Sequence, residues 1–222
     1  MTDYITAKQF KEAAGTEEWP VVGDGACAFY ATSSLAQSAQ LVQAIAELAG
    51  VEGHSPDIDV RPDGVTVRLL TKEAEYYGMS QRDVELARAI SAAAHSLGLK
   101  GDPSQVQSVL IVPGGADVAE LLPFWQAILG YERRPDSPDE DLVDPHLRHP
   151  GFWFERMKEL RADGGGAIHV AVWIPFEQAQ ARLDAALAAG GRMVRDDYAP
   201  AWWTLADAAG NEADISTIES RD

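Results

Sequence analysis

The chain has 222 residues, of which 46% are hydrophobic and 24% are charged, a balance typical of folded globular proteins. Its 35 acidic residues outnumber the 18 basic ones and give a formal net charge of -17, so we expect neither a nucleic-acid partner nor an anionic membrane partner. No run approaches the ~20 consecutive apolar residues that a membrane helix needs. We expect a cytoplasmic protein, because the start shows no secretory signal and the single cysteine, Cys27, excludes an intrachain disulfide.

A stretch rich in Gly and Pro near the middle divides the chain. Residues 98–105 interrupt both helical and strand patterns, so they are typical of a linker. We therefore expect two domains, residues 1–99 and 106–222, joined by residues 100–105. Both halves mix helices and strands, and the predicted fold class is α+β.

Three helices are expected in the first half. The first spans residues 6–14 with Thr6 as its N-cap, and the last starts from a capping-box sequence at Ser80 and runs to about residue 97. Between them, residues 34–49 carry apolar side chains at spacings of three and four. This pattern predicts one buried stripe formed by Leu35, Ala39, Val42, Ile45 and Ala49.

Strand patterns in the first half cover residues 27–32, 57–60 and 65–71. The last two flank residues 61–64, where Pro62 fixes φ and Gly64 tolerates a positive φ, so a hairpin is expected there.

The second half repeats one order of elements, a strand, a helix and further strands, twice. Gly130 ends the first helix and a pair of glycines ends the second. The expected strands are 108–112, 151–157, 167–174, 202–206 and 213–217, and the expected helices are 117–129 and 176–189.

His54 is the first candidate for chemistry. It lies between the long helix and the hairpin, in the sequence His54-Ser55-Pro56. The imidazole is either a capping or surface group, or a general acid–base, since a pKa near ~6.5 suits proton transfer at neutral pH. The residue pattern leaves both interpretations open.

The first hundred residues resemble the pterin-4a-carbinolamine dehydratase family. The resemblance is carried by Trp19, Thr71 and segments 32–34, 54–58, 65–69, 78–80 and 83–87. It implies a lyase that removes water from a 4a-hydroxytetrahydropterin, with the pterin as substrate rather than cofactor. The family motif is His-His-Pro, with a third His after the Thr that closes the hairpin, and this chain has His54, Ser55 and Lys72 at those three positions.

The resemblance assigns His54 as the main proton-transfer residue, with Ser55 and Lys72 supporting the leaving hydroxyl or its water. Pro56 and Asp57 continue the motif and are expected to contact the substrate, although a structural role also fits Asp57. The alternative is a catalytically degenerate domain that binds a pterin-like ring or provides an oligomer interface. Homo-oligomers are expected by resemblance alone, because dehydratase relatives commonly assemble through their sheets.

Residues 105–219 resemble the glyoxalase-like branch of the vicinal-oxygen-chelate superfamily. The resemblance rests on Asp117, segments 124–125, 129–131, 169–170 and 206–207, and residues 210–211. It implies two βαβββ modules around a common cavity and, in metal-dependent members, ligands on the first and last strands of each module.

By this resemblance, His169, Asp214 and Glu155 are the candidate ligands of a divalent metal. The alternative is a structural role, in which Glu155 and Asp214 are strand-edge charges and His169 is a packed histidine. The sequence requires no other cofactor.

Trp125, Trp173 and Trp203 are candidates to line an apolar cavity for a small molecule, although core packing explains each of them equally well. Three functions stay open: pterin dehydration in the first half, metal-assisted chemistry on a small metabolite in the second, or non-catalytic binding of a metabolite or drug there.

Overall fold

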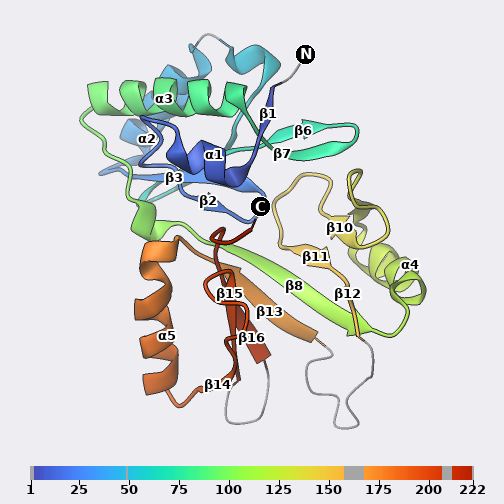
Figure 1. The fold of residues 1–222 in the computed structure, drawn as a ribbon. Coiled ribbons are helices and arrows are strands. Elements are labelled where there is room, and N and C mark those ends of the chain that lie inside the picture. The colour runs from blue at the N-terminus through green and yellow to red at the C-terminus, as the bar shows by residue number, and fades with distance from the viewer. Residues whose placement is uncertain (1–2, 49, 158–167, 207–211, 222) are drawn as a thin grey trace. The chain divides into compact units, whose positions relative to one another are not determined.

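The computed structural model describes residues 3–48, 50–157, 168–206 and 212–221. The chain forms two compact units, Met1–Val106 and Gln107–Arg221 (Figure 1). Each unit has its own helices and sheets, so the predicted α+β class is confirmed. Within the described ranges, no helix is long and apolar enough to cross a membrane.

The first unit contains two antiparallel sheets. The larger has the order β2-β3-β5-β4, and the smaller has the order β1-β7-β6. The larger sheet is formed by β2 (Val21–Val22), β3 (Gly25–Ala31), β4 (Asp57–Arg61) and β5 (Gly64–Leu69). The smaller is formed by β1 (Tyr4–Ile5), β6 (Thr71–Glu73) and β7 (Tyr76–Ser80).

The hairpin expected around residues 61–64 is confirmed, because Arg61 pairs with Gly64 across the turn. The strand expected over 65–71 is instead divided. It leaves the larger sheet at Leu69 and enters the smaller one at Thr71. Thr71 therefore belongs to the second sheet, where its hydroxyl lies beside the buried carboxylate described below.

Helices α2 (Leu35–Ala46) and α3 (Gln81–Ser96) cover one face of the larger sheet (Figure 1). The short helix α1 (Ala7–Glu12) begins at Thr6, whose side chain accepts a hydrogen bond from the Gln9 amide, while the Gln9 side chain returns to the Thr6 amide. The capping box predicted at Ser80 is likewise present at the start of α3.

The predicted buried stripe of α2 is wrong in its position. Leu35 is 68% exposed, and the buried residues are Ser38, Leu41 and Ile45. Both sets have helical spacing and share Ile45. Ala39 is exposed as well, and Ala49 lies outside the described residues. An alanine side chain contributes too little apolar area to decide which face turns inward.

We predict that Leu41→Ala lowers the free energy of unfolding by about 2–5 kcal/mol, because it empties a fully buried site. Leu35→Ala is the matched control and should change it by no more than about 0.5 kcal/mol, because that side chain is exposed. Urea unfolding followed by circular dichroism measures both. Equal losses would contradict this orientation of the helix.

The second unit contains two βαβββ modules. The first consists of β8 (Ser108–Gly115), α4 (Val118–Leu129), β9 (Glu132–Arg133), β10 (Asp141–Val143) and β11 (Gly151–Trp153), with the short β12 (Glu155–Arg156) after them. The second consists of β13 (Ile168–Trp173), a 3-10 turn (Phe176–Gln178), α5 (Ala179–Ala188), β14 (Arg192–Arg195), β15 (Trp202–Ala206) and β16 (Glu212–Ser216).

The strands of both modules join in one sheet with the order β14-β15-β16-β13-β8-β11-β10-β9. Within each module, the first strand pairs in parallel with a later one: β8 with β11 and β13 with β16. The modules meet through the antiparallel pair β8–β13. The two modules therefore have the same internal strand order on either side of that central pair.

The helices pack against one face of this sheet. The cluster under α4 includes Leu122, Leu142 and Phe152, and the cluster under α5 includes Leu183, Leu205 and Ile215. Because side chains alternate along a strand, the neighbours of these residues lie on the opposite face. We call that opposite face the helix-free face. In the second module it carries His169, Trp173, Trp202, Thr204, Asp214 and Ser216.

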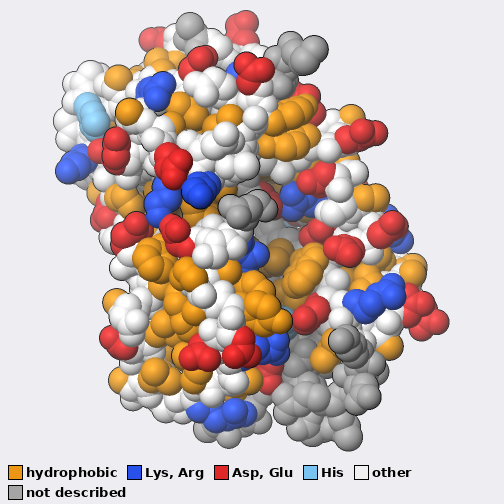
Figure 2. Space-filling view, viewed as in Figure 1, with side chains coloured by type: hydrophobic (Ala, Val, Ile, Leu, Met, Phe, Trp, Pro, Cys, Tyr) orange, Lys and Arg blue, Asp and Glu red, His pale blue; other side chains and the backbone are white. Residues whose placement is uncertain are grey.

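Charged side chains of both signs are interspersed on the face of the molecule drawn in Figure 2, where blue Lys and Arg lie among red Asp and Glu.

Candidate functional site

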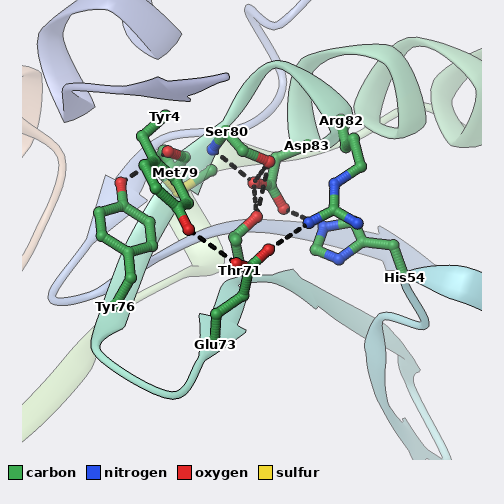
Figure 3. A network of polar contacts seen from close by, with 9 residues as sticks. All are labelled: Tyr4, His54, Thr71, Glu73, Tyr76, Met79, Ser80, Arg82 and Asp83. Atoms are coloured by element: carbon green, nitrogen blue, oxygen red, sulfur yellow. Dashed lines mark hydrogen bonds and ion pairs between the residues drawn. The ribbon is translucent and has the colours of Figure 1, made fainter. Parts of the chain in front are cut away.

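A histidine and a buried aspartate form the polar centre of the first unit (Figure 3). His54 follows a 3-10 turn (Val51–Gly53), and its Nε2 lies 2.6 Å from Oδ1 of Asp83. The His54 side chain is 12% exposed and that of Asp83 is 0% exposed. The imidazole can therefore be reached from solvent, whereas its carboxylate partner cannot.

The second oxygen of Asp83 accepts three hydrogen bonds. They come from Thr71 Oγ1 at 2.6 Å, the Ser80 amide at 2.7 Å and the Ser80 hydroxyl at 2.9 Å. Asp83 is the third residue of α3, so the same carboxylate caps this helix and holds His54. Through these contacts it also ties β6 and the end of β7 to the helix.

Electrostatics decide which nitrogen of His54 carries the hydrogen. Burial alone would raise the pKa of Asp83. The hydrogen bonds from His54, Thr71 and Ser80 and the charge of His54 outweigh it, so the pKa is lowered. The ionised carboxylate can only accept, so the neutral imidazole donates from Nε2. Its Nδ1 has no hydrogen-bond partner within the described part of the chain and offers a lone pair.

The other two expected catalytic residues do not contact the imidazole. The Ser55 hydroxyl donates to the Val51 carbonyl at 2.9 Å. Lys72 follows Thr71 on the strand and points to the other side of it, with Nζ 5.3 Å from the centre of the Tyr77 ring. The structure thus places a serine and an ammonium group near the motif without bringing either into hydrogen-bond contact with His54.

Of the two expected substrate contacts, Pro56 is half-buried beside the motif. Asp57 lies on the edge strand β4, where Oδ2 accepts from Arg68 Nη2 at 2.6 Å. This ion pair gives Asp57 a structural role on the sheet surface.

A second polar group surrounds the hairpin β6–β7. Glu73 accepts from Arg82 Nη2 at 2.8 Å and from the Tyr4 hydroxyl at 2.7 Å, and Tyr4 stacks on Tyr76 with ring centres 3.9 Å apart (Figure 3). Nothing in the sequence pattern indicated this group, because its members come from three separate segments.

In the second unit, the structure brings together two of the three expected metal ligands. His169 Nε2 lies 3.3 Å from Asp214 Oδ2, and Asp214 Oδ1 accepts from Thr204 Oγ1 at 2.6 Å. Glu155 is on β12 at the end of β8, and its charge acts on His169. Within the described ranges, however, no three His, Cys, Asp or Glu side chains form a group that could hold a metal ion.

The electrostatics of His169 also favour an ion pair. Burial alone would lower its pKa. The hydrogen bond and charge of Asp214, with the charges of Glu155 and Glu212, outweigh burial and raise the pKa. His169 and Asp214 therefore form a histidine–carboxylate pair, and Glu155, the third expected ligand, acts on His169 through its charge.

The three expected cavity tryptophans do not share one surface. Trp125 packs against the α4 cluster and Trp203 against the α5 cluster, while Trp173 lies on the helix-free face. Strand alternation explains the separation of the last two, because Trp202, the residue before Trp203, takes the helix-free side of β15.

Two family models match the chain, one in each of its two units. Residues 3–93 match the family model described as pterin 4 alpha carbinolamine dehydratase. A Nocardia farcinica protein assigned as a pterin-4-alpha-carbinolamine dehydratase is 38% identical over 77 residues, covering 35% of this chain and 79% of that protein. The chain belongs to the pterin-4-alpha-carbinolamine dehydratase family. A relative with the same assignment from Thermomicrobium roseum is 32% identical over 94 residues, covering 42% of this chain and 96% of its own length.

The residues that match the dehydratase family model lie in the first unit. Residues 110–216 match the model of a glyoxalase-like domain, and the second unit is glyoxalase-like. A solved glyoxalase/bleomycin resistance protein/dioxygenase superfamily member from Vibrio splendidus 12B01 aligns with 50% of this chain and 99% of its own, at 15% identity and a TM-score of 0.33.

We predict that Asp83→Asn lowers the free energy of unfolding by about 1–3 kcal/mol at neutral pH, because it disrupts a buried, fully bonded carboxylate. The folded pKa of Asp83 is depressed, so its stabilisation is complete above the usual pKa of 3.8 and is lost as pH falls through the lower folded value. Acid titration of urea unfolding should show this loss in the wild type and a shallower one in Asp83→Asn. Asp57→Asn, at an exposed carboxylate, is the control and should keep the wild-type profile.

Proposed function

We propose that the first unit catalyses the dehydration of a 4a-hydroxytetrahydropterin. The observation that carries this proposal is the imidazole of His54, which a buried, ionised Asp83 holds at 2.6 Å while its Nδ1 stays available. Membership of the dehydratase family supports the choice of substrate.

The reaction breaks the C4a–O bond of the substrate and removes the proton from N5, so a C4a=N5 double bond forms and water leaves. His54 Nδ1 takes the N5 proton, and the imidazolium passes a proton to the departing hydroxide. Asp83 stabilises the positive charge on the ring between these two transfers, and it keeps the ring oriented by accepting from Nε2. Atoms and charges balance with one histidine as the relay.

In this scheme Lys72 supports the leaving group, whereas Ser55 does not take part. An ammonium group can donate a hydrogen bond to the departing hydroxide but cannot accept a proton. The Ser55 hydroxyl keeps its hydrogen in the bond to Val51. We therefore expect a slower enzyme than one with imidazoles at all three positions.

We predict that His54→Ala lowers kcat for dehydration by about 10²–10⁴-fold, the usual contribution of a general acid–base. His95→Ala is the control, because this exposed histidine pairs with Glu18 away from the proposed relay, and it should leave the rate unchanged. Absorbance changes of the pterin on adding purified protein measure both. If wild-type protein gives no rate above buffer, the proposal fails.

A gain-of-function pair tests the supporting positions. We expect Lys72→His and Ser55→His, combined, to raise kcat above wild type at neutral pH, because two imidazoles would replace groups that exchange protons poorly there. Activity that appears only in the double variant would identify the natural unit as degenerate, which is the alternative function. Pterin binding to the wild type, measured by calorimetry, would then remain as its activity.

A further inference from the structure

The helix-free face of the second unit carries a guanidinium group clamped between two indoles. The Cζ atom of Arg221 lies 4.4 Å from the ring centre of Trp173 and 5.1 Å from that of Trp202. Both tryptophans pair in register with Ser216, one from each side, so their rings stand together on this face. Arg221 follows the last strand and reaches back over them.

Backbone contacts fix the side chain in this position. Arg221 Nε donates to the Thr217 carbonyl at 3.1 Å, and Thr217 is itself fully buried. The Thr217 hydroxyl donates to the Pro200 carbonyl at 2.6 Å and accepts from the Glu219 amide at 3.2 Å. The segment that presents Arg221 is therefore anchored to the sheet, which reduces the entropy lost when a ligand binds.

The two terminal nitrogens of Arg221 make no hydrogen bond within the described part of the chain. Five other arginines are paired with carboxylates: Arg61, Arg68, Arg82, Arg134 and Arg148. Asp214 acts on Arg221 through its charge, but its oxygens are engaged by Thr204 and His169. Arg221 is also an exposed residue, so a molecule from solvent can reach its free edge.

We propose that Arg221 anchors the oxyanion of a small molecule, a carboxylate or a phosphate, on the helix-free face of the second unit. A planar guanidinium with both terminal nitrogens free matches the two oxygens of such a group. Contacts with Trp173 and Trp202 orient the guanidinium group of Arg221, and the two indoles provide an apolar surface for the rest of a flat ligand. The site lies wholly in the glyoxalase-like unit, so the proposal does not depend on pterin dehydration.

The test is a calorimetric titration of the full chain with each of two probes, benzoate and inorganic phosphate. Arg221→Gln should raise the dissociation constant at least about tenfold, and Arg221→Lys should weaken binding less, because it keeps the charge but loses the fork. Arg192→Gln is the matched control, since this exposed arginine lies on the edge strand β14, and it should bind as wild type does. The probe that binds more tightly identifies the source of the oxyanion.

Two results would overturn the proposal. One is that neither probe binds at concentrations up to roughly 10 mM, which is weaker than any useful recognition of a metabolite. The other is that binding is the same in Arg221→Gln as in wild type. Circular dichroism and urea unfolding of each variant separate loss of binding from loss of fold, and the dehydration assay gives an independent readout on the first unit.

Discussion

The first unit depends on one buried carboxylate. Asp83 receives hydrogen bonds from the start of α3, from β6 and from His54, and without them it would be a buried charge with no partner. A buried charge is tolerated only when it is so completely bonded. The hydrogen bonds that stabilise the buried Asp83 thus include the one that orients the His54 imidazole. A substitution of Asp83 is therefore expected to change both stability and the proposed chemistry.

The second unit also contains a histidine paired with a carboxylate, in a different structural setting. Its histidine and aspartate sit on neighbouring strands of an open sheet, and Thr204 supplies the further hydrogen bond that Asp214 needs. The helices cover the other face, so binding groups can be placed on this one without disturbing the hydrophobic clusters. We infer that the chain keeps its two candidate sites chemically distinct, one for proton transfer and one for recognition of an anion.

Much of the fold was predictable from the sequence, because long periodic segments such as α3 carry strong local patterns. The strands β9 and β10 were not predicted, since two or three residues are too short to show alternation. The first site was recognisable only in part. His54 stands in a recognisable motif. Asp83 did not stand out, because its place in the capping box at Ser80 already explained an acidic residue there, and its contact with His54 joins residues 29 positions apart. Arg221 could not be found from sequence, because its indole partners come from two different strands.

The position of the two modules in the second sheet has one more consequence. With β8 and β13 at the centre, the exposed edges are β9 and β14. An unprotected edge invites another chain to add a strand and begin an aggregate. Here one edge is only two residues long and wholly charged, and the other begins and ends with arginine and is interrupted by an irregular register. The arrangement that joins the modules thus leaves at the rims two strands poorly suited to intermolecular pairing.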